Sequence, residues 1–341
     1  MMQLILFEIK KQLKQKKLYL FLIVPVIFVL IMFFQNNGEQ EQFLDDKINQ
    51  IENYLKEVDM QTAELQYEVS EDGIKQFQTL NEIGRVLFTW KQAVREEQYP
   101  QSLTLEEDFL NLLVDYEDIA GPVILSEWER NVALEKNAIL QQHNYHYINE
   151  EHPVDPLLFT VQIGKWIFSL LGIVFTILLF GNLVMVEKEG KTLPFLFTQP
   201  IKKSYILIAK FLSSLLIVVM TIFVTIGAAF LVCFLFGDAT FYWHYPMYTE
   251  ALETFAFVSP GMIIGRIILY FISLISFALS IALFVSCFTS SSFIQIVMTL
   301  QVLLLGYLIT DFSPRLDTGW NPFYLFHQLN KVDELITTAN V

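Results

Sequence analysis

Long hydrophobic blocks without charge alternate with polar segments along the chain. The blocks are Leu18 to Phe34, Trp166 to Val186, Phe211 to Gly237 and Ile267 to Thr310. A membrane-spanning helix needs about 20 mostly apolar residues, so the first three blocks fit one span each and the fourth is long enough for two. The polar run from Thr289 to Ser292 is the natural turn inside the fourth block. The pattern therefore predicts five spans.

The long polar segment between the first two blocks shows helical rather than strand periodicity. Its first apolar positions alternate spacings of four and three residues: Leu44, Ile48, Ile51, Leu55 and Val58. That spacing is typical of a coiled-coil-like helical seam. Thr104 with Glu107, and Ser126 with Glu129, have the spacing of capping boxes, which start helices. About 120 residues of this kind can bury a core of their own, so we expect an α-helical domain.

Residues 1–17 have the pattern of an amphipathic helix. Met2, Leu6, Ile9 and Leu13 recur at spacings of four, three and four residues, and lysines cover the other side. Such a helix lies in the membrane interface with its lysines toward anionic headgroups. The alternative is a simple basic anchor for the first span.

These patterns divide the chain into a sequence of predicted segments and give the fold class of an all-α integral membrane protein. The segments are an interfacial helix at 1–17, a first span at 18–34, an acidic helical domain at 35–157, a second span at 158–186, a loop at 187–204, a third span at 205–237, a loop at 238–262, a fourth span at 263–288, a turn at 289–292, a fifth span at 293–310 and a final segment at 311–341. The run FYWHYPMY, Phe241 to Tyr248, follows the third span, and we expect it to form an aromatic belt at the bilayer interface.

Composition and charge agree with this division and orient it. Hydrophobic residues make up 54% of the 341, which excludes an ordinary soluble domain. The net charge is −14, but residues 35–157 carry 26 acidic and 8 basic residues, so the remainder is positive. Because Lys and Arg near span ends are retained in the cytoplasm, residues 1–17 and the loop after the second span are expected inside, and the acidic domain outside. Five spans then leave 311–341 outside, and we expect a sixth span to follow.

One group of residues near the end of the acidic domain resembles a metal site only weakly. Zinc favours His and carboxylate ligands, which His143, His146 and His152 with nearby Glu and Asp would supply, but no defined zinc signature is present. We therefore expect a polar loop and no metal. The acidic surface would attract cationic peptides, although a solvated charged face is the simpler interpretation. No nucleic-acid partner is expected.

The tripeptide from Gly190 to Thr192 raises the question of whether the chain binds ATP itself. A P-loop has the form G-x-x-x-x-G-K-[ST] between a strand and a helix, but Met185 stands where the first glycine is required, and a membrane span precedes it. The chain is therefore expected to bind no nucleotide and to carry no catalytic residue. The absence of charges inside spans two to five away from their ends also argues against an ion-coupled pump.

The stretch EKEGKTLPFLFTQPIKKSYILIAK resembles the signature of the type-2 family of ABC transporter permeases. That signature runs E-x-E-x-G-T, then an apolar stretch ending in P-[IV]-[SK]-[RK], then a lysine early in the next span. The matching residues are Glu187, Glu189, Thr192, Leu193, Leu196, Pro200, Ile201, Lys203 and Lys210. The departure is at Lys191, where the family usually has glycine, because Gly190 comes one residue earlier. The N-terminal FEIKKQLKQKKLYL is also similar to the family's interfacial helix.

The resemblance implies a type-2 ABC exporter transmembrane fold and a division of labour between subunits. Such permeases pair as homo- or heterodimers in the cell membrane, with the N-terminus cytoplasmic, above two cytoplasmic ATPase subunits that hold ATP and Mg. The loop after the second span would form the coupling helix that contacts the ATPase. Its residues in this chain are Glu187, Glu189, Gly190, Thr192, Leu193, Phe195, Leu196, Pro200, Ile201, Lys202 and Lys203.

The substrate and two alternative functions stay open at this point. A peptide such as a bacteriocin or toxin suits the Phe-rich spans and the acidic exterior, and lipids, drugs or a polysaccharide are the alternative substrates. One alternative is a mechanotransmitting ABC permease, which drives its external domain and moves nothing through the bilayer. The other is a membrane receptor that senses through the external helical domain.

Overall fold

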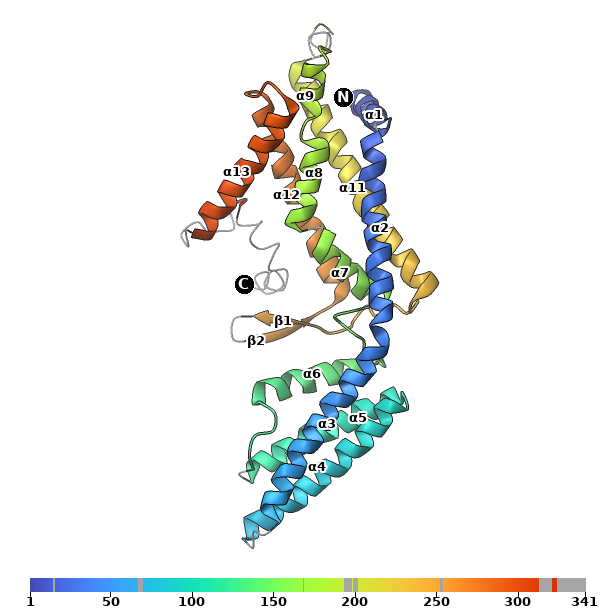
Figure 1. Ribbon diagram of the computed structural model, residues 1–341, viewed down its shortest axis with the longest axis vertical. Helices are drawn as coiled ribbons and strands as arrows, with labels where there is room; N and C mark the ends of the chain where they lie inside the picture. The colour runs from blue at the N-terminus through green and yellow to red at the C-terminus, as the bar shows by residue number, and fades with distance from the viewer. Residues whose placement is uncertain are drawn as a thin grey trace.

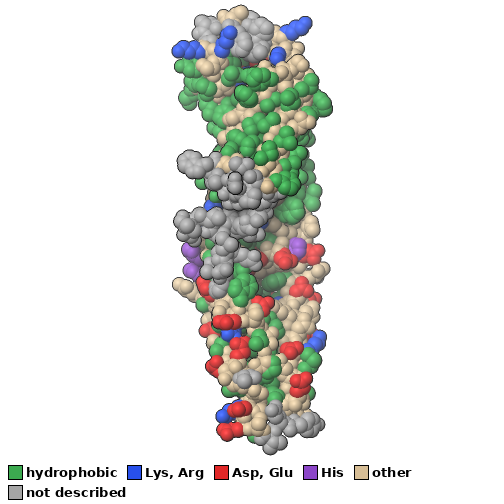
Figure 2. Space-filling model, turned by 90° about the vertical axis from the view of Figure 1, so that its left-hand side faces the viewer, with side chains coloured by type: hydrophobic (Ala, Val, Ile, Leu, Met, Phe, Trp, Pro, Cys, Tyr) green, Lys and Arg blue, Asp and Glu red, His purple; other side chains and the backbone are tan. Residues whose placement is uncertain are grey.

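The chain folds into two stacked parts, a membrane domain and a separate helical bundle (Figure 1). The computed structural model describes residues 1–14, 16–66, 70–119, 121–167, 169–192, 198, 202–251, 254–312 and 321–323. Almost all the regular structure in these residues is helical, which confirms the predicted fold class. Figure 2 shows Lys and Arg side chains at one end, a hydrophobic band below them, and Asp and Glu side chains over the bundle at the other end.

Within the described residues, the membrane domain contains five helical segments long and apolar enough to cross a membrane, as predicted. Its helices are α1 (Met2–Leu13), α2 (Lys16–Gly38), α7 (Pro156–Ile167), α8 (Leu170–Phe180), α9 (Leu183–Glu189), α11 (Lys203–Phe236), α12 (Pro260–Ser286) and α13 (Ser292–Phe312). Ile177, Leu274 and Ala278 lie at the centre of the apolar core that joins α8 and α12. Many apolar side chains on the outer faces of these helices are exposed, as expected of helices in contact with lipid.

The second span differs from the continuous helix predicted over 158–186. It is divided into α7, α8 and α9, and only α8 together with α9 forms the candidate span Leu170–Glu189. The Ser169 hydroxyl accepts a hydrogen bond from the Leu171 N–H and so caps the start of α8. A Cβ at Gly172 would lie 1.9 Å from the Ile167 carbonyl oxygen, so the chain requires glycine at this close approach. An apolarity pattern does not detect such a break.

The acidic domain is a bundle of four helices with its own core. They are α3 (Gln40–Leu65), α4 (Glu71–Arg95), α5 (Tyr99–Asp118) and α6 (Glu127–His143). The predicted seam is confirmed, because Ile51 and Val58 are buried and the other three seam residues pack against the same core. Trp90 and Phe109 pack tilted against each other at its centre, with ring centroids 5.8 Å apart. We call this bundle the acidic domain throughout.

One of the two predicted capping boxes is correct and the other is wrong. Ser126 and Glu129 form the full box at the start of α6. Thr104 instead lies inside α5, where its hydroxyl donates to the Pro100 carbonyl oxygen. The helix begins at Tyr99 because Pro100 fits its first turn, where the missing N–H of proline costs no hydrogen bond.

A joint of aromatic residues connects the two domains. Residues 238–262, expected as a loop, contain an antiparallel hairpin of β1 (Met247–Ala251) and β2 (Thr254–Val258). Tyr242 and Tyr245 are buried with Leu103 of α5 and Leu157 of α7. Only part of the run FYWHYPMY is therefore exposed, as the residues of an aromatic belt at the bilayer interface would be. Its two buried tyrosines hold the acidic domain against the membrane domain.

Asp155 caps α7 from a buried position at this joint. Its Oδ1 accepts hydrogen bonds from the backbone N–H groups of Leu157 and Leu158, at 3.1 and 3.0 Å. Its Oδ2 is buried without a hydrogen-bond partner among the described residues. Burial raises the pKa of this carboxyl to about 6, although the two backbone hydrogen bonds act in the opposite direction. The charged form is thus disfavoured in the fold.

We expect Asp155→Asn to stabilise the protein at pH 8 and to leave it unchanged near pH 4. The pKa of Asp155 is higher in the folded protein than in the unfolded chain, so its protonated form favours folding. This contribution is fully present below about pH 4 and is lost as the pH rises through about 6. The difference is about 2–3 kcal/mol, at 1.36 kcal/mol per pKa unit. Asn keeps the capping oxygen and has no charge to bury. Melting temperatures in detergent between pH 4 and 8 test this, and an unchanged pH profile in the variant would contradict it.

Candidate functional site

Three helices converge at the end of the membrane domain that carries the N-terminus, which we call the basic end (Figure 1). There α1 packs along α11, and α9 ends beside them. Glu8 and Gln12 are one helical turn apart on α1 and both are buried. Met2 and Leu6, from the predicted apolar stripe, are exposed. The helix therefore turns a polar face to the protein and its apolar face outward.

Lys210 is the centre of a buried network of charges. Its side chain is 2% exposed, and its Nζ lies 2.6 Å from Glu187 Oε1 and 3.2 and 3.3 Å from the two carboxylate oxygens of Glu8. The half-exposed Lys11 pairs with the same Glu187 oxygen. Two acids from α1 and α9 thus meet two bases from α1 and α11. Buried charges are costly unless paired in this way, so the network fixes the three helices to one another.

A hydrogen-bonded chain extends the network along α11. The Gln12 amide donates to the Ser213 hydroxyl at 2.9 Å, and that hydroxyl donates to the Lys210 carbonyl oxygen at 2.9 Å. Ser214 also donates to this carbonyl, at 2.8 Å. The contact between α1 and α11 is therefore specified by polar groups in a largely apolar surrounding.

The two residues that follow Glu187 contact a different part of the domain. The Glu189 carboxylate accepts hydrogen bonds from the Ser292 N–H at 2.6 Å and from its hydroxyl at 2.9 Å. Ser292 is the first residue of α13, and a carboxylate at a helix N-terminus is favourable. Lys188 Nζ donates to the Thr289 carbonyl oxygen at 2.7 Å. The end of α9 is thus connected to α1, to α11 and to the turn between α12 and α13.

The predicted coupling residues at the start of the loop form a tight turn. Gly190 ends α9, and the Thr192 N–H donates to the Glu187 carbonyl oxygen at 3.0 Å. Lys191 has a φ of 55°, in the left-handed region that favours glycine. This is the position at which the type-2 permease signature usually has glycine. The one residue that departs from the signature therefore lies at a position where the backbone conformation favours the glycine that it replaces.

The remaining predicted coupling residues divide into two groups. Lys202 is the N-cap residue of α11, and Lys203 begins the helix. Leu193, Phe195, Leu196, Pro200 and Ile201 lie outside the described residues. Their role in a docking surface stays a prediction.

Sequence reasoning missed the parts of the network contributed by α1. Glu8 is the one acidic residue in 1–17, and Lys210 lies next to a long uncharged block. Opposite charges in apolar surroundings tend to pair, so these two residues carried a usable signal. Gln12 and Ser213 carried none, because their contact joins residues 201 positions apart.

The three histidines proposed as weak metal ligands have other contacts. His143 stacks on His244 with ring centroids 4.8 Å apart. The His146 ring lies within 3.3 Å of the Tyr242 hydroxyl, and burial lowers its pKa. His152 instead lines a cavity of the acidic domain. In the described part of the chain, no three His, Cys, Asp or Glu side chains converge on a possible metal position.

The family described as "ABC-2 family transporter protein" matches residues 2–326 of the chain. No curated protein and no solved structure matches. The matched range includes all the helices given above for the described residues, and all the residues of the buried network.

We expect Lys210→Met to destabilise the protein strongly, because Glu8 and Glu187 would keep buried charges without their shared cation. Removing one partner of a buried pair costs about 3–5 kcal/mol. The apparent melting temperature in detergent should fall by about 10 °C, at roughly 2–4 °C per kcal/mol.

Two further variants separate this effect from a simple loss of charge. Lys10→Met removes an exposed lysine from the same basic end and should change the melting temperature little. The triple variant Glu8→Gln, Glu187→Gln and Lys210→Met replaces the buried charges with neutral groups and should recover most of the loss. A Lys210→Met variant as stable as Lys10→Met would show that the network does not hold the helices together.

Proposed function

The chain belongs to the ABC-2 family of transporter proteins, and we propose that it is the membrane-spanning permease subunit of an ATP-driven exporter whose ATPase subunits are separate proteins. The family match supports a permease component of an ABC transporter in a multi-pass membrane protein. The sequence between α9 and α11 does not fit a P-loop, so ATP and Mg belong on the partner. The chain itself is a non-catalytic transport subunit.

The proposed orientation puts the basic end in the cytoplasm and the acidic domain outside. Lys10, Lys11, Lys14, Lys188 and Lys202 all belong to the basic end, and cytoplasmic segments of membrane proteins are enriched in such residues. The opposite end is dominated by carboxylates (Figure 2). The loop between α9 and α11 then faces the compartment that contains ATP.

The observation that carries the proposal is the buried network around Lys210. Glu187 is the first residue of the predicted coupling loop and Lys210 follows the loop, and the two side chains form an ion pair at 2.6 Å. The loop therefore begins and ends on one fixed unit, which includes α1 through Glu8. Glu189 connects the same unit to α13. A movement imposed on the loop by an ATPase would be transmitted to these helices as a rigid body.

A second permease subunit completes the proposed transporter. The exposed apolar faces of the membrane domain contact lipid or this second copy, and the path for the substrate runs between the two permeases. A peptide is the proposed substrate class, since the acidic domain would attract cationic peptides on the outer side.

One observation favours mechanical work on the acidic domain as a second candidate function. α2 ends at Gly38 and α3 begins at Gln40, so a nearly continuous helix runs from the membrane domain into the acidic domain. Tilting of α2 would therefore move α3 directly (Figure 1). In that case ATP hydrolysis would drive the acidic domain, as in a mechanotransmitting permease.

We expect an ABC ATPase to co-purify in stoichiometric amount when the protein is extracted from its native membrane in mild detergent. Mass spectrometry of the purified complex identifies the partner. Phe195→Asp puts a charge in the apolar part of the predicted coupling loop and should remove the ATPase, because a buried unpaired charge disfavours docking. Glu189 is unsuitable for this test, because its carboxylate accepts hydrogen bonds from Ser292 at the start of α13.

Ser290→Asp is the matched control, because it adds the same charge to an exposed residue in the turn between α12 and α13 at the same end. This variant should retain the ATPase. If no ATPase co-purifies under conditions that preserve a known complex, the exporter proposal fails. Equal retention of the ATPase by both variants would remove the coupling role of the loop.

A further inference from the structure

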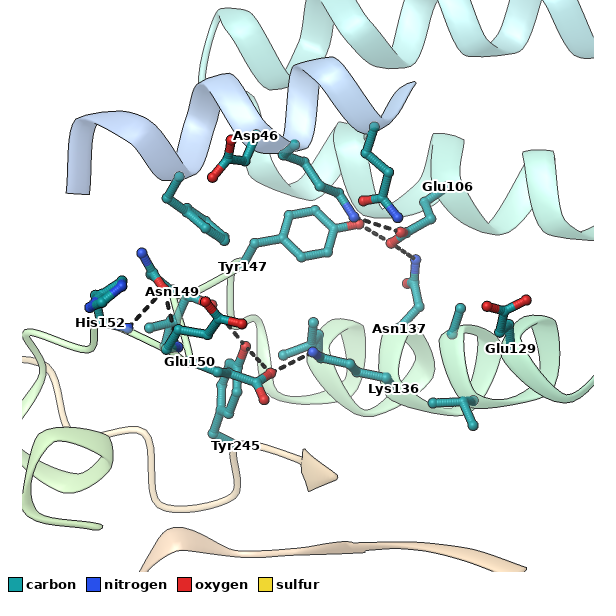
Figure 3. A pocket seen from close by; sticks show the side chains of 18 of the residues that line it. Asp46, Glu106, Glu129, Lys136, Asn137, Tyr147, Asn149, Glu150, His152 and Tyr245 are labelled. Atoms are coloured by element: carbon teal, nitrogen blue, oxygen red, sulfur yellow. Dashed lines mark hydrogen bonds and ion pairs between the residues drawn. The ribbon is translucent and has the colours of Figure 1, made fainter. Parts of the chain in front are cut away.

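The acidic domain contains a cavity of about 600 Å³. Its walls come from α3, from α6, from Glu106 of α5 and from the segment 147–152 that leads toward α7, with Tyr245 from the joint between the domains (Figure 3). Ligand sites in proteins commonly have volumes of about 300–1,000 Å³. The cavity is thus large enough for a few residues of a peptide, and it lies where both domains contribute to its wall.

The lining is strongly negative. Its acidic residues are Glu39, Asp46, Glu106, Glu129, Glu150 and Glu151. Lys47 and Lys136 are the basic ones among the lining residues. Aromatic rings of Phe43, Trp128 and Tyr147 lie among them. Carboxylates beside aromatic faces form an environment that suits ammonium and guanidinium groups.

The lining already binds two ammonium groups of the chain itself in this manner. Lys47 Nζ lies 3.0 Å from a Glu106 oxygen and 4.4 Å from the centre of the Tyr147 ring. Lys136 pairs with Glu150 at 2.5 Å and lies 5.9 Å from the centre of the Tyr245 ring. Each lysine is thus held by one carboxylate and at least one ring.

The inner carboxylates are satisfied, whereas several others have no cation. Glu106 accepts from Lys47, from Asn137 at 3.0 Å and from the Tyr147 hydroxyl (Figure 3). Glu39, Asp46 and Glu151 form no ion pair with any described residue. All three line the same cavity as Phe43, with Glu39 and Asp46 on the side of α3 and Glu151 in the segment 147–152. The cavity therefore offers the same combination of carboxylates and an aromatic ring that holds Lys47 and Lys136, but here no ammonium group of the described chain is bound.

Asn149 adds a hydrogen-bond donor to the lining. The residue is 8% exposed, and its Oδ1 accepts from the backbone N–H groups of Glu151 and His152, at 3.1 and 2.9 Å. Its Nδ2 makes no hydrogen bond with the described residues and is open to the cavity that Asn149 lines. A backbone carbonyl oxygen of a bound peptide can accept a hydrogen bond from this amide, whereas a protonated polyamine has no acceptor to offer.

We propose that this cavity binds a segment of a Lys- or Arg-bearing peptide outside the membrane. A cationic side chain of the peptide lies among Glu39, Asp46 and Glu151, and a backbone carbonyl oxygen accepts from Asn149 Nδ2. The site is separate from the basic end, and its test involves neither ATP nor an ATPase. Failure of this inference would therefore leave the proposed coupling function untouched, and the reverse also holds.

Isothermal titration calorimetry on the purified full-length protein in detergent tests the proposal. The probe is an acetylated and amidated tetrapeptide of alternating lysine and alanine, and we expect saturable binding to one site per chain. The double variant Asp46→Asn and Glu151→Gln should weaken binding at least tenfold. The double variant Asp59→Asn and Glu64→Gln is the control, because it removes the same charge from exposed positions of α3 outside the cavity. It should leave the affinity within about twofold.

Asn149→Asp separates the proposed hydrogen bond from attraction by charge alone. The aspartate keeps the acceptor oxygen of Asn149 but replaces the donor with a further negative charge. Simple attraction predicts tighter binding of the peptide, whereas loss of the donor predicts weaker binding. Weaker binding by this variant, with the control unchanged, supports the proposal.

Several results would overturn it. No saturable binding of the peptide would remove the site. Equal weakening in the two charge-removing double variants would show unspecific attraction to an acidic surface. Binding of spermidine at an affinity that the peptide does not reach would assign the cavity to free polyamines instead.

Discussion

A lysine buried in apolar surroundings must be paired with a negative charge. At Lys210 this requirement determines how the helices of the basic end are arranged. The ammonium group takes one carboxylate from α1 and one from α9, so α1 is held at one point with two helices that come much later in the sequence. The apolar contacts of these helices alone would permit sliding, because they are not directional. The charges add a fixed register. The end of α9 then connects this unit to α13 through Glu189, and the predicted coupling loop emerges from it.

Two connections link the helices of this buried network to the acidic domain. α2 follows α1 after a short break and continues almost without interruption into α3 of the acidic domain. On the other side, Tyr242 and Tyr245 follow α11 and are buried against α5 and α6. The acidic domain is thus attached to helices adjoining the Lys210 network by two routes. Movement at the basic end therefore has a physical path to the acidic domain, along the run of α2 into α3 in Figure 1.

The sequence predicted the features that depend on local patterns and missed those that depend on distant contacts. Five spans, the helical seam of α3 and the cap at Ser126 follow from periodicity and spacing, and they are present. The break before α8 depends on a close approach at Gly172, which apolarity does not reveal. At the basic end, the family signature pointed to Glu187 and Lys210, but the contact of Lys210 with Glu8 joins residues 202 positions apart. Only the fold brings such residues together.

The central claim is that α1 and α11 move as one body, and a cross-link between them tests it most directly. The Gln12 amide and the Ser213 hydroxyl are buried partners at 2.9 Å, so both residues would be changed to Cys in a chain whose exposed Cys287 is replaced by Ser. A short bifunctional methanethiosulfonate then joins the two thiols through two disulfides and takes the place of the missing glutamine side chain. ATP hydrolysis by the complex with its ATPase is measured with the cross-link and again after its reduction. The account predicts that the cross-link forms and that the activity changes by less than about twofold. Loss of activity on cross-linking, with recovery on reduction, would mean that α1 moves against α11 and would contradict the account.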